Sequence, residues 1–350
     1  MFLLCVPKGS YSLWHKRHPA RYTGRKPHTE ESSMNFRIIG TGSQKPACVK
    51  TNEDLTKFLD TSDEWITTRT GIKERRVITT ETLSELATKA AEHALEMAGI
   101  SAEDLDFIIC STIRGDYITP SLACVVAKNL GAHCAAFDVN AACSGFVYAM
   151  DCAAGYFERG RAEHILVVSA EAMSKMVDWN DRATCVLFGD SAGAVVMEKG
   201  DSLLSVRLTS EGNTDFLAIP NVEGNSPFSE HEEPAHFLHM DGQNVYKFAV
   251  NAMSTDLKWV IENAGLTQDD IDHVLPHQAN IRIIETAMRK LKIPHDRYHI
   301  NIQHSGNTSS ACIPVLLDEL NRAGELKRGD IIAMSAFGGG LTTGAAVLRW

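Results

Sequence analysis

Three side chains of this sequence have the chemistry of a nucleophile and of hydrogen-bond donors. Cys143 lies in AACSGF, His277 in PHQAN and Asn307 in GNTSSA. A thiol at the start of a helix faces unpaired N–H groups and partial positive charge, which lower its pKa and favour the thiolate. The small residues beside Cys143 leave its sulfur open to a substrate carbonyl. These residue types therefore predict a nucleophilic cysteine with two accompanying donors.

Each of the three residues also has a purely structural explanation. A free cysteine is commonly buried as a small apolar residue, and asparagine is common in turns and helix caps. All three, however, lie at predicted strand-to-helix junctions, which is where open α/β sheets place their chemistry. Their joint placement therefore favours a site over three unrelated structural residues.

The elements that position these residues form an internal repeat. The segment MAGISAEDLDFIICS (97–111) aligns without a gap with NAGLTQDDIDHVLPH (263–277). Each copy follows an amphipathic helix pattern and enters an apolar strand after a glycine stop and an acidic turn. Helix-end residues of this kind are common, but the length of the match favours duplication of an α/β unit.

Helical patterns alternate with apolar strands beyond residue 34, which predicts an α/β protein with parallel or mixed sheets covered by helices. We expect two related halves, residues 34–205 and 206–350, in one compact body with pseudo-twofold symmetry. The predicted strands are FRIIGTG, LDFIICST, AAFDVN, HILVVSA, GAVVMEK, HVLPH, DIIAMSAFG and GAAVLRW.

Residues 1–33 differ from the rest, with six basic residues against two acidic ones. We interpret them as a disordered extension or a start assigned too far upstream, rather than a transit-type peptide. The 350 residues contain nine irregularly spaced cysteines and no C-x-x-C, which favours reduced thiols in the cytoplasm over disulfides or zinc. No apolar run is long enough to cross a bilayer, and the net charge of −10 gives no indication of nucleic-acid binding.

The order and spacing of several motifs resemble the thiolase-like condensing enzymes, most closely the β-ketoacyl-acyl carrier protein synthase III family. The motifs are TSDEWITTRTGI (61–72), AACSGF (141–146), NDRAT (180–184), FGDSAGAVV (188–196), PHQAN (276–280), GNTSSA (306–311) and AFGGGLTTGA (336–345). The resemblance runs from about Met34 to Trp350. It implies the thiolase-like fold, in which duplicated α/β halves form a layered αβαβα body.

The same resemblance implies a decarboxylative condensation of acyl-coenzyme A with malonyl-acyl carrier protein. The products are 3-ketoacyl-acyl carrier protein, coenzyme A and CO₂, and the reaction initiates fatty-acid synthesis. It implies that Cys143 is the nucleophile that carries the acyl group, while His277 and Asn307 stabilise the enolate formed when CO₂ leaves. His277 must then be a neutral donor rather than a base. The backbone N–H groups of Cys143 and Gly339 are implied as a second oxyanion hole.

Further contacts are implied by the resemblance. Coenzyme A would contact Thr61, Trp65, Arg69, Arg182 and Gln243, although Gln243 stands where the family often has Asn. The carrier protein would contact the basic residues Lys247, Arg282, Arg289 and Lys290, which are also explicable as a solvated helix face. The acyl pocket would include Phe337 and Thr119, the latter contributed by the neighbouring subunit of a homodimer.

Some alternatives remain open at this point. A related enzyme of secondary metabolism, making an alkylquinolone or polyketide starter, has the same motifs. A Cys-His-Asn hydrolase would use His277 as the base of the thiol, and a non-catalytic scaffold is disfavoured because all three site residues are present. No cofactor is expected, since coenzyme A enters as part of the substrate. The histidines of SEHEEPAHFLHM (229–240) lack zinc-helix spacing, so we expect a mobile loop and no metal.

Overall fold

The computed structural model describes residues 35–221, residue 228 and residues 236–350. The prediction made for residues 1–33, and the part of the histidine-rich loop between residues 229 and 235, lie outside this range. From Met34 to Trp350 the chain forms one compact unit.

Two sheets form the framework. The first has the order β1-β7-β6-β4-β5 and consists of β1 (Asn35–Gln44), β7 (Asp190–Gly200), β6 (His164–Ala172), β4 (Phe107–Ser111) and β5 (Ala135–Val139). The second has the order β11-β12-β13-β8 and consists of β11 (His273–Pro276), β12 (Ile331–Gly338), β13 (Gly340–Arg349) and β8 (Leu203–Asn213). Parallel pairs join β4 to β5 and β6, and β11 to β12, while the other pairs are antiparallel. The predicted mixed α/β architecture is confirmed.

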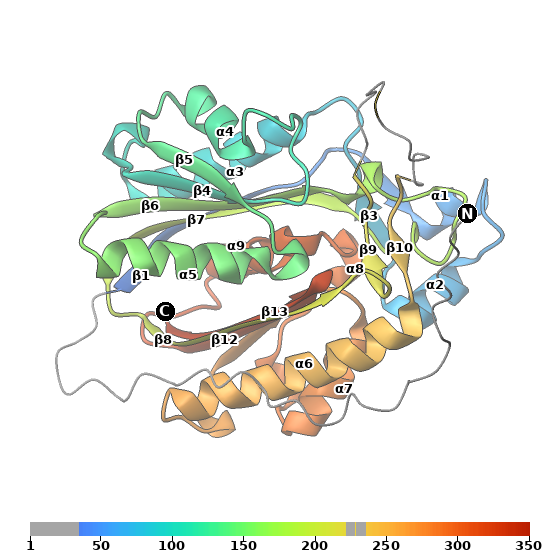
Figure 1. The fold of residues 1–350 in the computed structure, drawn as a ribbon. Coiled ribbons are helices and arrows are strands. Elements are labelled where there is room, and N and C mark those ends of the chain that lie inside the picture. Colours follow the sequence, from blue (N-terminus) through green and yellow to red (C-terminus); the bar gives the residue numbers. More distant parts are fainter. Residues whose placement is uncertain (1–34, 222–227, 229–235) are drawn as a thin grey trace, which may run out of the picture. The chain divides into compact units, whose positions relative to one another are not determined.

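Helices cover the outer face of each sheet and also fill the space between the sheets, which gives the alternating αβαβα layers of Figure 1. The outer helices are α3 (Leu83–Ala98) and α4 (Leu122–Leu130) on the first sheet, and α6 (Gly242–Asn263) and α7 (Ile281–Leu291) on the second. The central helices are α5 (Gly145–Glu158) and α9 (Cys312–Arg322). A cluster of buried apolar side chains lies at each interface, and the central cluster joins both sheets.

The two copies of the internal repeat have the same local structure. Helix α3 is followed by Gly99 in the left-handed region at φ +71°, and α6 is followed by Gly265 at φ +74°. A short 3₁₀ turn with a capping box then precedes each strand, at Ala102–Asp104 before β4 and at Gln268–Asp270 before β11. The helix–turn–strand unit read from the sequence is therefore present twice.

All eight predicted strands are present. Within the two main sheets β8 was not predicted, and neither were the short strands β2, β3, β9 and β10. In β8, polar and charged residues interrupt the apolar ones, and the strand lies at the edge of the second sheet. It therefore lacks the continuous apolar run of a central strand. The division into halves stays a prediction. The first sheet lies within residues 35–200 and the second within residues 203–349.

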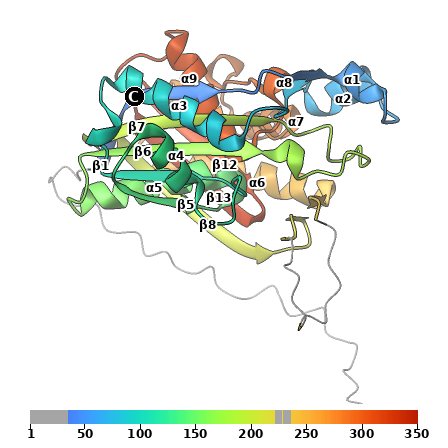
Figure 2. The same ribbon diagram turned by 90° about the horizontal axis from the view of Figure 1, so that it is seen from above.

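Small elements gather at one end of the layers, as Figures 1 and 2 show. They are β2 (Val49–Thr51), α1 (Asn52–Thr56), α2 (Asp63–Thr70), β3 (Glu74–Arg76), β9 (Leu217–Ala218), β10 (His239–Met240) and α8 (Ile302–Ser305). The fully buried Arg75 connects β3 to α1 and to the segment before β7, by donating to Asn52 Oδ1 at 2.9 Å and to the Val186 carbonyl at 2.8 Å. Among the helices of the described residues, none is long and apolar enough to span a membrane.

Candidate active site

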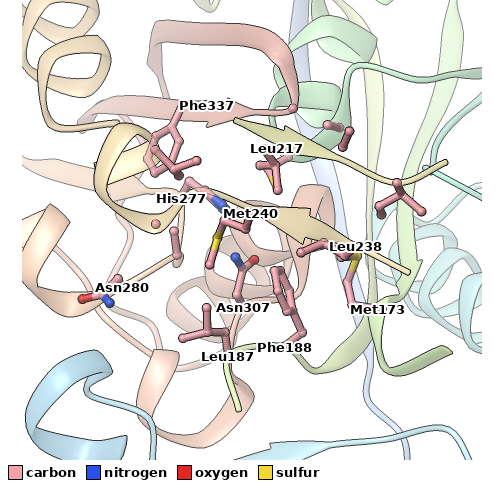
Figure 3. A pocket seen from close by; sticks show the side chains of 18 of the residues that line it. Met173, Leu187, Phe188, Leu217, Leu238, Met240, His277, Asn280, Asn307 and Phe337 are labelled. Carbon is pink, nitrogen blue, oxygen red and sulfur yellow. The ribbon is translucent and has the colours of Figure 1, made fainter. Parts of the chain in front are cut away.

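A cavity of about 630 Å³ brings together the three residues predicted to carry chemistry. Cys143, His277 and Asn307 all line it, although they come from separate parts of the chain. Figure 3 shows His277 and Asn307 facing the same space, bordered by Leu217, Leu238 and Met240 among other apolar side chains. The predicted convergence of the three residues is observed. Asn307, however, lies in the turn between α8 and α9 and does not follow a strand, so its predicted strand-to-helix position is wrong.

The backbone presents Cys143 at a tight turn between β5 and α5. Ala142 has a positive φ of +46°, and a 3₁₀ turn over Ala142–Ser144 leads into α5 at Gly145. The carbonyl of Ala141 accepts hydrogen bonds from Ser144 Oγ at 2.7 Å and Thr342 Oγ1 at 2.9 Å. These contacts fix the turn, so the thiol has a defined position at the base of the helix.

Burial determines the acidity of the Cys143 thiol. The residue is only 7% exposed, and desolvation raises the pKa of the thiol from 9.0 to about 12, although a hydrogen bond from the Ser309 side chain lowers it in part. This rise corresponds to about 4 kcal/mol against the thiolate, whereas a helix N-terminus contributes at most about 2 kcal/mol. The prediction of a lowered thiol pKa is therefore wrong, because the loss of solvation outweighs the helix dipole.

His277 is neutral and held by its surroundings. His277 directly follows β11, and its backbone N–H donates to the Ser335 carbonyl at 2.7 Å. The residue is 1% exposed. Burial lowers the pKa of the imidazole to about 3. Nδ1 lies 2.9 Å from Cys312 Sγ, and the ring of Phe337 meets the imidazole edge-on with centroids 5.2 Å apart. The low pKa agrees with the neutral state expected for His277.

Asn307 is oriented by the turn that carries it. Gly306 adopts φ +64°, and Asn307 donates its backbone N–H to the Leu187 carbonyl at 2.8 Å. Its side-chain Oδ1 accepts the backbone N–H of Ser309, also at 2.8 Å. Because the oxygen is engaged within the turn, the NH₂ group of the amide is the part available to the cavity.

The glycine-rich segment forms the reversal between β12 and β13, as expected for a segment that leads into a strand. A Cβ on Gly338 would lie 2.6 Å from the backbone nitrogen of Cys143, so only glycine permits this approach. Gly339, predicted as an oxyanion-hole residue, lines the cavity next to it. The backbones of the two predicted oxyanion-hole residues therefore lie close together.

The residues predicted to contact coenzyme A do not all lie in the cavity wall. Trp65 and Arg69 line it, and the guanidinium carbons of Arg69 and Arg182 lie 4.7 Å and 5.2 Å from the centre of the Trp65 ring. Thr61 lies just before α2, and its buried hydroxyl has no hydrogen-bond partner. Gln243 is exposed at the start of α6, beside the lining residue Gly242.

The remaining predicted residues divide between the surface and the cavity. Phe337 lines the cavity, whereas Thr119 is exposed on a loop outside it. The four predicted carrier-protein residues are exposed on α6 and α7, and they are Lys247, Arg282, Arg289 and Lys290. The guanidinium of Arg282 also donates to the Thr68 carbonyl at 2.7 Å, which connects α7 to α2.

Sequence reasoning missed several polar residues around the thiol. Glu171, fully buried in β6, accepts hydrogen bonds from Ser310 Oγ at 2.7 Å and Ser309 Oγ at 3.1 Å. Burial raises the pKa of this carboxyl group to about 7. An acidic residue inside the apolar segment HILVVSAEA was the signal available for it. Cys312, beside His277, carried no comparable signal.

The apolar cavity wall was also missed, since only Phe337 and Thr119 were predicted for it. It is built mainly from short elements and loops with weak sequence patterns, and includes Met173, Leu187, Phe188, Leu217, Leu238 and Met240. Among the residues the structure describes, no group of three or more His, Cys, Asp or Glu side chains is arranged to hold a metal ion.

Comparison with known proteins places this site in a family. The family model for 3-oxoacyl-[acyl-carrier-protein (ACP)] synthase III matches residues 137–212, and the model for the C-terminal part of the same synthase matches residues 261–350. Among solved structures, the 3-oxoacyl-[acyl-carrier-protein] synthase III of Aquifex aeolicus superimposes with a TM-score of 0.85 at 46% identity, covering 91% of this chain and all of that one. A priming β-ketosynthase of the R1128 polyketide pathway superimposes with a TM-score of 0.84 at 34% identity, covering 93% and 98%.

Sequence relatives agree with the structural comparison. The β-ketoacyl-[acyl-carrier-protein] synthase III of Clostridium acetobutylicum is 49% identical over 318 residues, which cover 89% of this chain and 98% of the relative. Since identity at this level extends over almost the whole length of such relatives, the chain belongs to the 3-oxoacyl-[acyl-carrier-protein] synthase III family of condensing enzymes.

Proposed function

We propose that this enzyme condenses an acyl-coenzyme A with malonyl-acyl carrier protein, releasing CO₂ and coenzyme A and initiating fatty-acid synthesis. The observation that carries the proposal is one cavity that holds a thiol, a neutral imidazole and an oriented amide. Relatives that are 46% to 49% identical to this chain are named β-ketoacyl-[acyl-carrier-protein] synthase III.

In the first half-reaction, Cys143 attacks the thioester carbonyl and forms an acyl-enzyme, and coenzyme A leaves as its thiol. The carbonyl oxygen becomes negatively charged in the tetrahedral intermediate, and backbone N–H groups of Cys143 and Gly339 are the donors assigned to it. Gly338 supports this role because the absence of its Cβ allows the two backbones to approach.

In the second half-reaction, the malonyl thioester loses CO₂ and becomes an enolate. Its carbon attacks the acyl-Cys143 carbonyl and forms the new C–C bond, while the C–S bond breaks and the Cys143 sulfur leaves. The thioester oxygen gains negative charge as CO₂ departs, and N–H donors from His277 and Asn307 stabilise it. A neutral imidazole is required, since it donates without exchanging a proton with the enolate. The low pKa of His277 supports this assignment.

The other functions weighed for these residues are less well supported. A hydrolase would need His277 to take the proton of the thiol, but burial lowers its pKa to about 3 and its Nδ1 contacts Cys312. A role in secondary metabolism would resemble that of the R1128 priming ketosynthase, which at 34% identity is less similar to this chain than the synthases of Aquifex aeolicus and Clostridium acetobutylicum, at 46% and 49%.

The substrate contacts form part of the proposal. Coenzyme A is assigned to Trp65, Arg69 and Arg182, with Thr61 and Gln243 nearby, because an aromatic ring beside two guanidinium groups suits an adenine nucleotide. The acidic carrier protein is assigned to the exposed basic residues of α6 and α7. The reaction needs no cofactor, since the chain supplies every group that it uses.

We also propose a homodimer in the cytoplasm. Eight cysteines of the described residues are free thiols, as suits a reducing compartment. Beside Thr119, the side chains of Tyr117 and Ile118 are 59% and 89% exposed, which supports a partner subunit covering this loop.

Intact-mass spectrometry tests the reaction class. Mixed with acyl-coenzyme A, the wild-type enzyme should gain the mass of one acyl group, which malonyl-acyl carrier protein then removes as 3-ketoacyl product. Cys143→Ala should gain no acyl mass, whereas Cys110→Ala, which removes a buried cysteine of the core, should behave as wild type. Release of free fatty acid without a need for malonate would instead identify a hydrolase.

A further inference from the structure

Cys312, which the proposed reaction does not use, makes the only direct polar contact recorded for the His277 side chain in the described part of the chain. Its Sγ lies 2.9 Å from His277 Nδ1, and it also accepts the backbone N–H of Gln278 at 3.4 Å. Both side chains are almost completely buried, at 2% exposure for Cys312 and 1% for His277. The question is which of the two atoms carries the hydrogen between them.

Both partners are uncharged, so a single proton lies between them. Burial raises the pKa of the Cys312 thiol well above its ordinary value and lowers that of His277, which leaves S–H and a neutral imidazole with one N–H. A thiol sulfur is a weak acceptor, whereas an unprotonated imidazole nitrogen is a good one. Since Sγ already accepts the N–H of Gln278, its own hydrogen is best used as a donor to Nδ1.

We infer that Cys312 is a positioning residue that donates its S–H to Nδ1 of His277 and thereby keeps the imidazole proton on Nε2, as a hydrogen-bond donor towards the cavity. The opposite tautomer would leave a lone pair facing the substrate, and a lone pair repels a developing oxyanion. The inference rests on the proposed role of His277 in stabilising the enolate.

The arrangement parallels that of Asn307. The backbone N–H of Ser309 engages Asn307 Oδ1 and leaves the NH₂ group for the cavity, while the Cys312 thiol engages Nδ1 and leaves Nε2–H. Both contacts come from the short stretch that follows Asn307 and opens α9. One segment therefore orients both donors of the proposed enolate site.

Three variants separate this role from simple packing. Cys312→Ser keeps an O–H donor of similar size, Cys312→Ala removes the donor, and Cys110→Ala is the matched control for loss of a buried thiol away from the cavity. The rates to compare are the decarboxylation of malonyl-acyl carrier protein and the acylation of Cys143. Cys312→Ala should lose about tenfold in decarboxylation, as expected for one lost buried hydrogen bond, with little change in acylation. Cys312→Ser should regain most of the decarboxylation rate.

The tautomer is measured directly by ¹⁵N NMR of histidine-labelled enzyme, with His277→Ala to assign the signals. The wild type and Cys312→Ser should have the proton on Nε2, and Cys312→Ala should have a mixture of tautomers. The inference is overturned if His277 of the wild-type enzyme carries its proton on Nδ1, a result that does not require any variant to fold. It is also overturned if a folded Cys312→Ala variant decarboxylates at the wild-type rate. If His277→Ala decarboxylates normally, the proposed role of His277 fails instead, whatever the tautomer.

Discussion

The carboxyl oxygen Oε1 of Glu171 lies 2.7 Å from the hydroxyl of Ser310, inside the protein and close to the nucleophile. The single proton of the Ser309 hydroxyl has two acceptors within reach: Oε1 of Glu171 at 3.1 Å, and the Cys143 sulfur, whose pKa a hydrogen bond from this hydroxyl lowers. In contrast, the negative charge of Glu171 raises the pKa of Cys143. The reactivity of the thiol is therefore coupled to the ionisation of a buried acid.

Glu171→Gln should make Cys143 more reactive above neutral pH. Burial raises the pKa of Glu171 to about 7, so the carboxyl group is neutral below this pH and charged above it. Above pH 7 the variant lacks the charge that opposes the thiolate, and alkylation of Cys143 by iodoacetamide should be about threefold to tenfold faster than in wild type. Below pH 6 the two rates should converge.

The matched control is Glu158→Gln, which removes an exposed carboxylate from the C-terminal end of α5. Its alkylation rates should follow wild type at every pH. Equal rates for Glu171→Gln and wild type above pH 8 would show that Glu171 does not influence the thiol.

The two half-reactions should respond differently to loss of the side-chain donors. His277→Ala or Asn307→Ala should slow decarboxylation by about 10²- to 10³-fold, the usual effect of removing one oxyanion donor, and should affect acylation of Cys143 much less. Asn307→Asp retains the shape of the side chain but adds negative charge, so it should be at least as damaging. Equal loss of both half-reactions in His277→Ala would mean that His277 is the base of the thiol.

Sequence reasoning identified the repeat and the strand-to-helix junctions because these depend on local patterns. Glycine stops, acidic turns and apolar strands specify where Cys143 and His277 stand along the chain. Asn307 was grouped with them from its glycine-containing turn before a helix, and the resemblance to a known family then gave it a role, since no local feature distinguishes it from an ordinary turn residue. These parts of the site follow from short segments of sequence.

Other features depend on long-range packing and left no pattern to read. The pKa of Cys143 was predicted in the wrong direction, since the depth at which the thiol is buried is set by elements distant in sequence. The contact between Cys312 and His277 joins residues 35 positions apart. Likewise the cavity wall includes Leu217 and Met240, from strands too short to predict.

Loss of the aromatic ring at Trp65 should weaken binding of acyl-coenzyme A. The Trp65 ring lies beside two guanidinium groups. Stacking of a base such as adenine on an aromatic ring contributes about 1–3 kcal/mol of binding energy. Trp65→Ala should raise KM for acyl-coenzyme A by about tenfold or more, with KM for malonyl-acyl carrier protein unchanged. The control is Trp259→Ala, which breaks a comparable pair between Trp259 of α6 and Arg207 of β8, and it should not alter KM for acyl-coenzyme A. If both variants behave alike, the assignment of Trp65 is wrong.

Reversal of charge on α7 should weaken recognition of the carrier protein. Arg289 and Lys290 are exposed in the last turn of α7, and an acidic partner is attracted to such a patch mainly during encounter. Arg289→Glu should raise KM for malonyl-acyl carrier protein several-fold at low salt, and the difference should shrink as salt screens the charges. Lys258→Glu, on the C-terminal part of α6, provides a control. A defect with malonyl-coenzyme A of the same size would indicate damage to the active site rather than lost docking.

The last prediction concerns the length of the acyl primer and depends on Thr119. In this family the residue at this position is expected to enter the far end of the partner's acyl pocket, where members that use acetyl groups often carry a bulky Phe. Thr119 is smaller, and a ring replaced by Thr leaves space for several methylenes, each worth about 0.8 kcal/mol when buried. The exposed position of Thr119, on the same loop as Tyr117 and Ile118, is compatible with a contribution to a second subunit. We therefore expect the enzyme to accept primers longer than acetyl, as measured by kcat/KM with primers of two to about twelve carbons. Thr119→Phe should lose the longer primers and keep acetyl, while Ile118→Ala tests whether the neighbouring side chain fills the space instead. A preference for acetyl alone that is unchanged in Thr119→Phe would refute the role of Thr119.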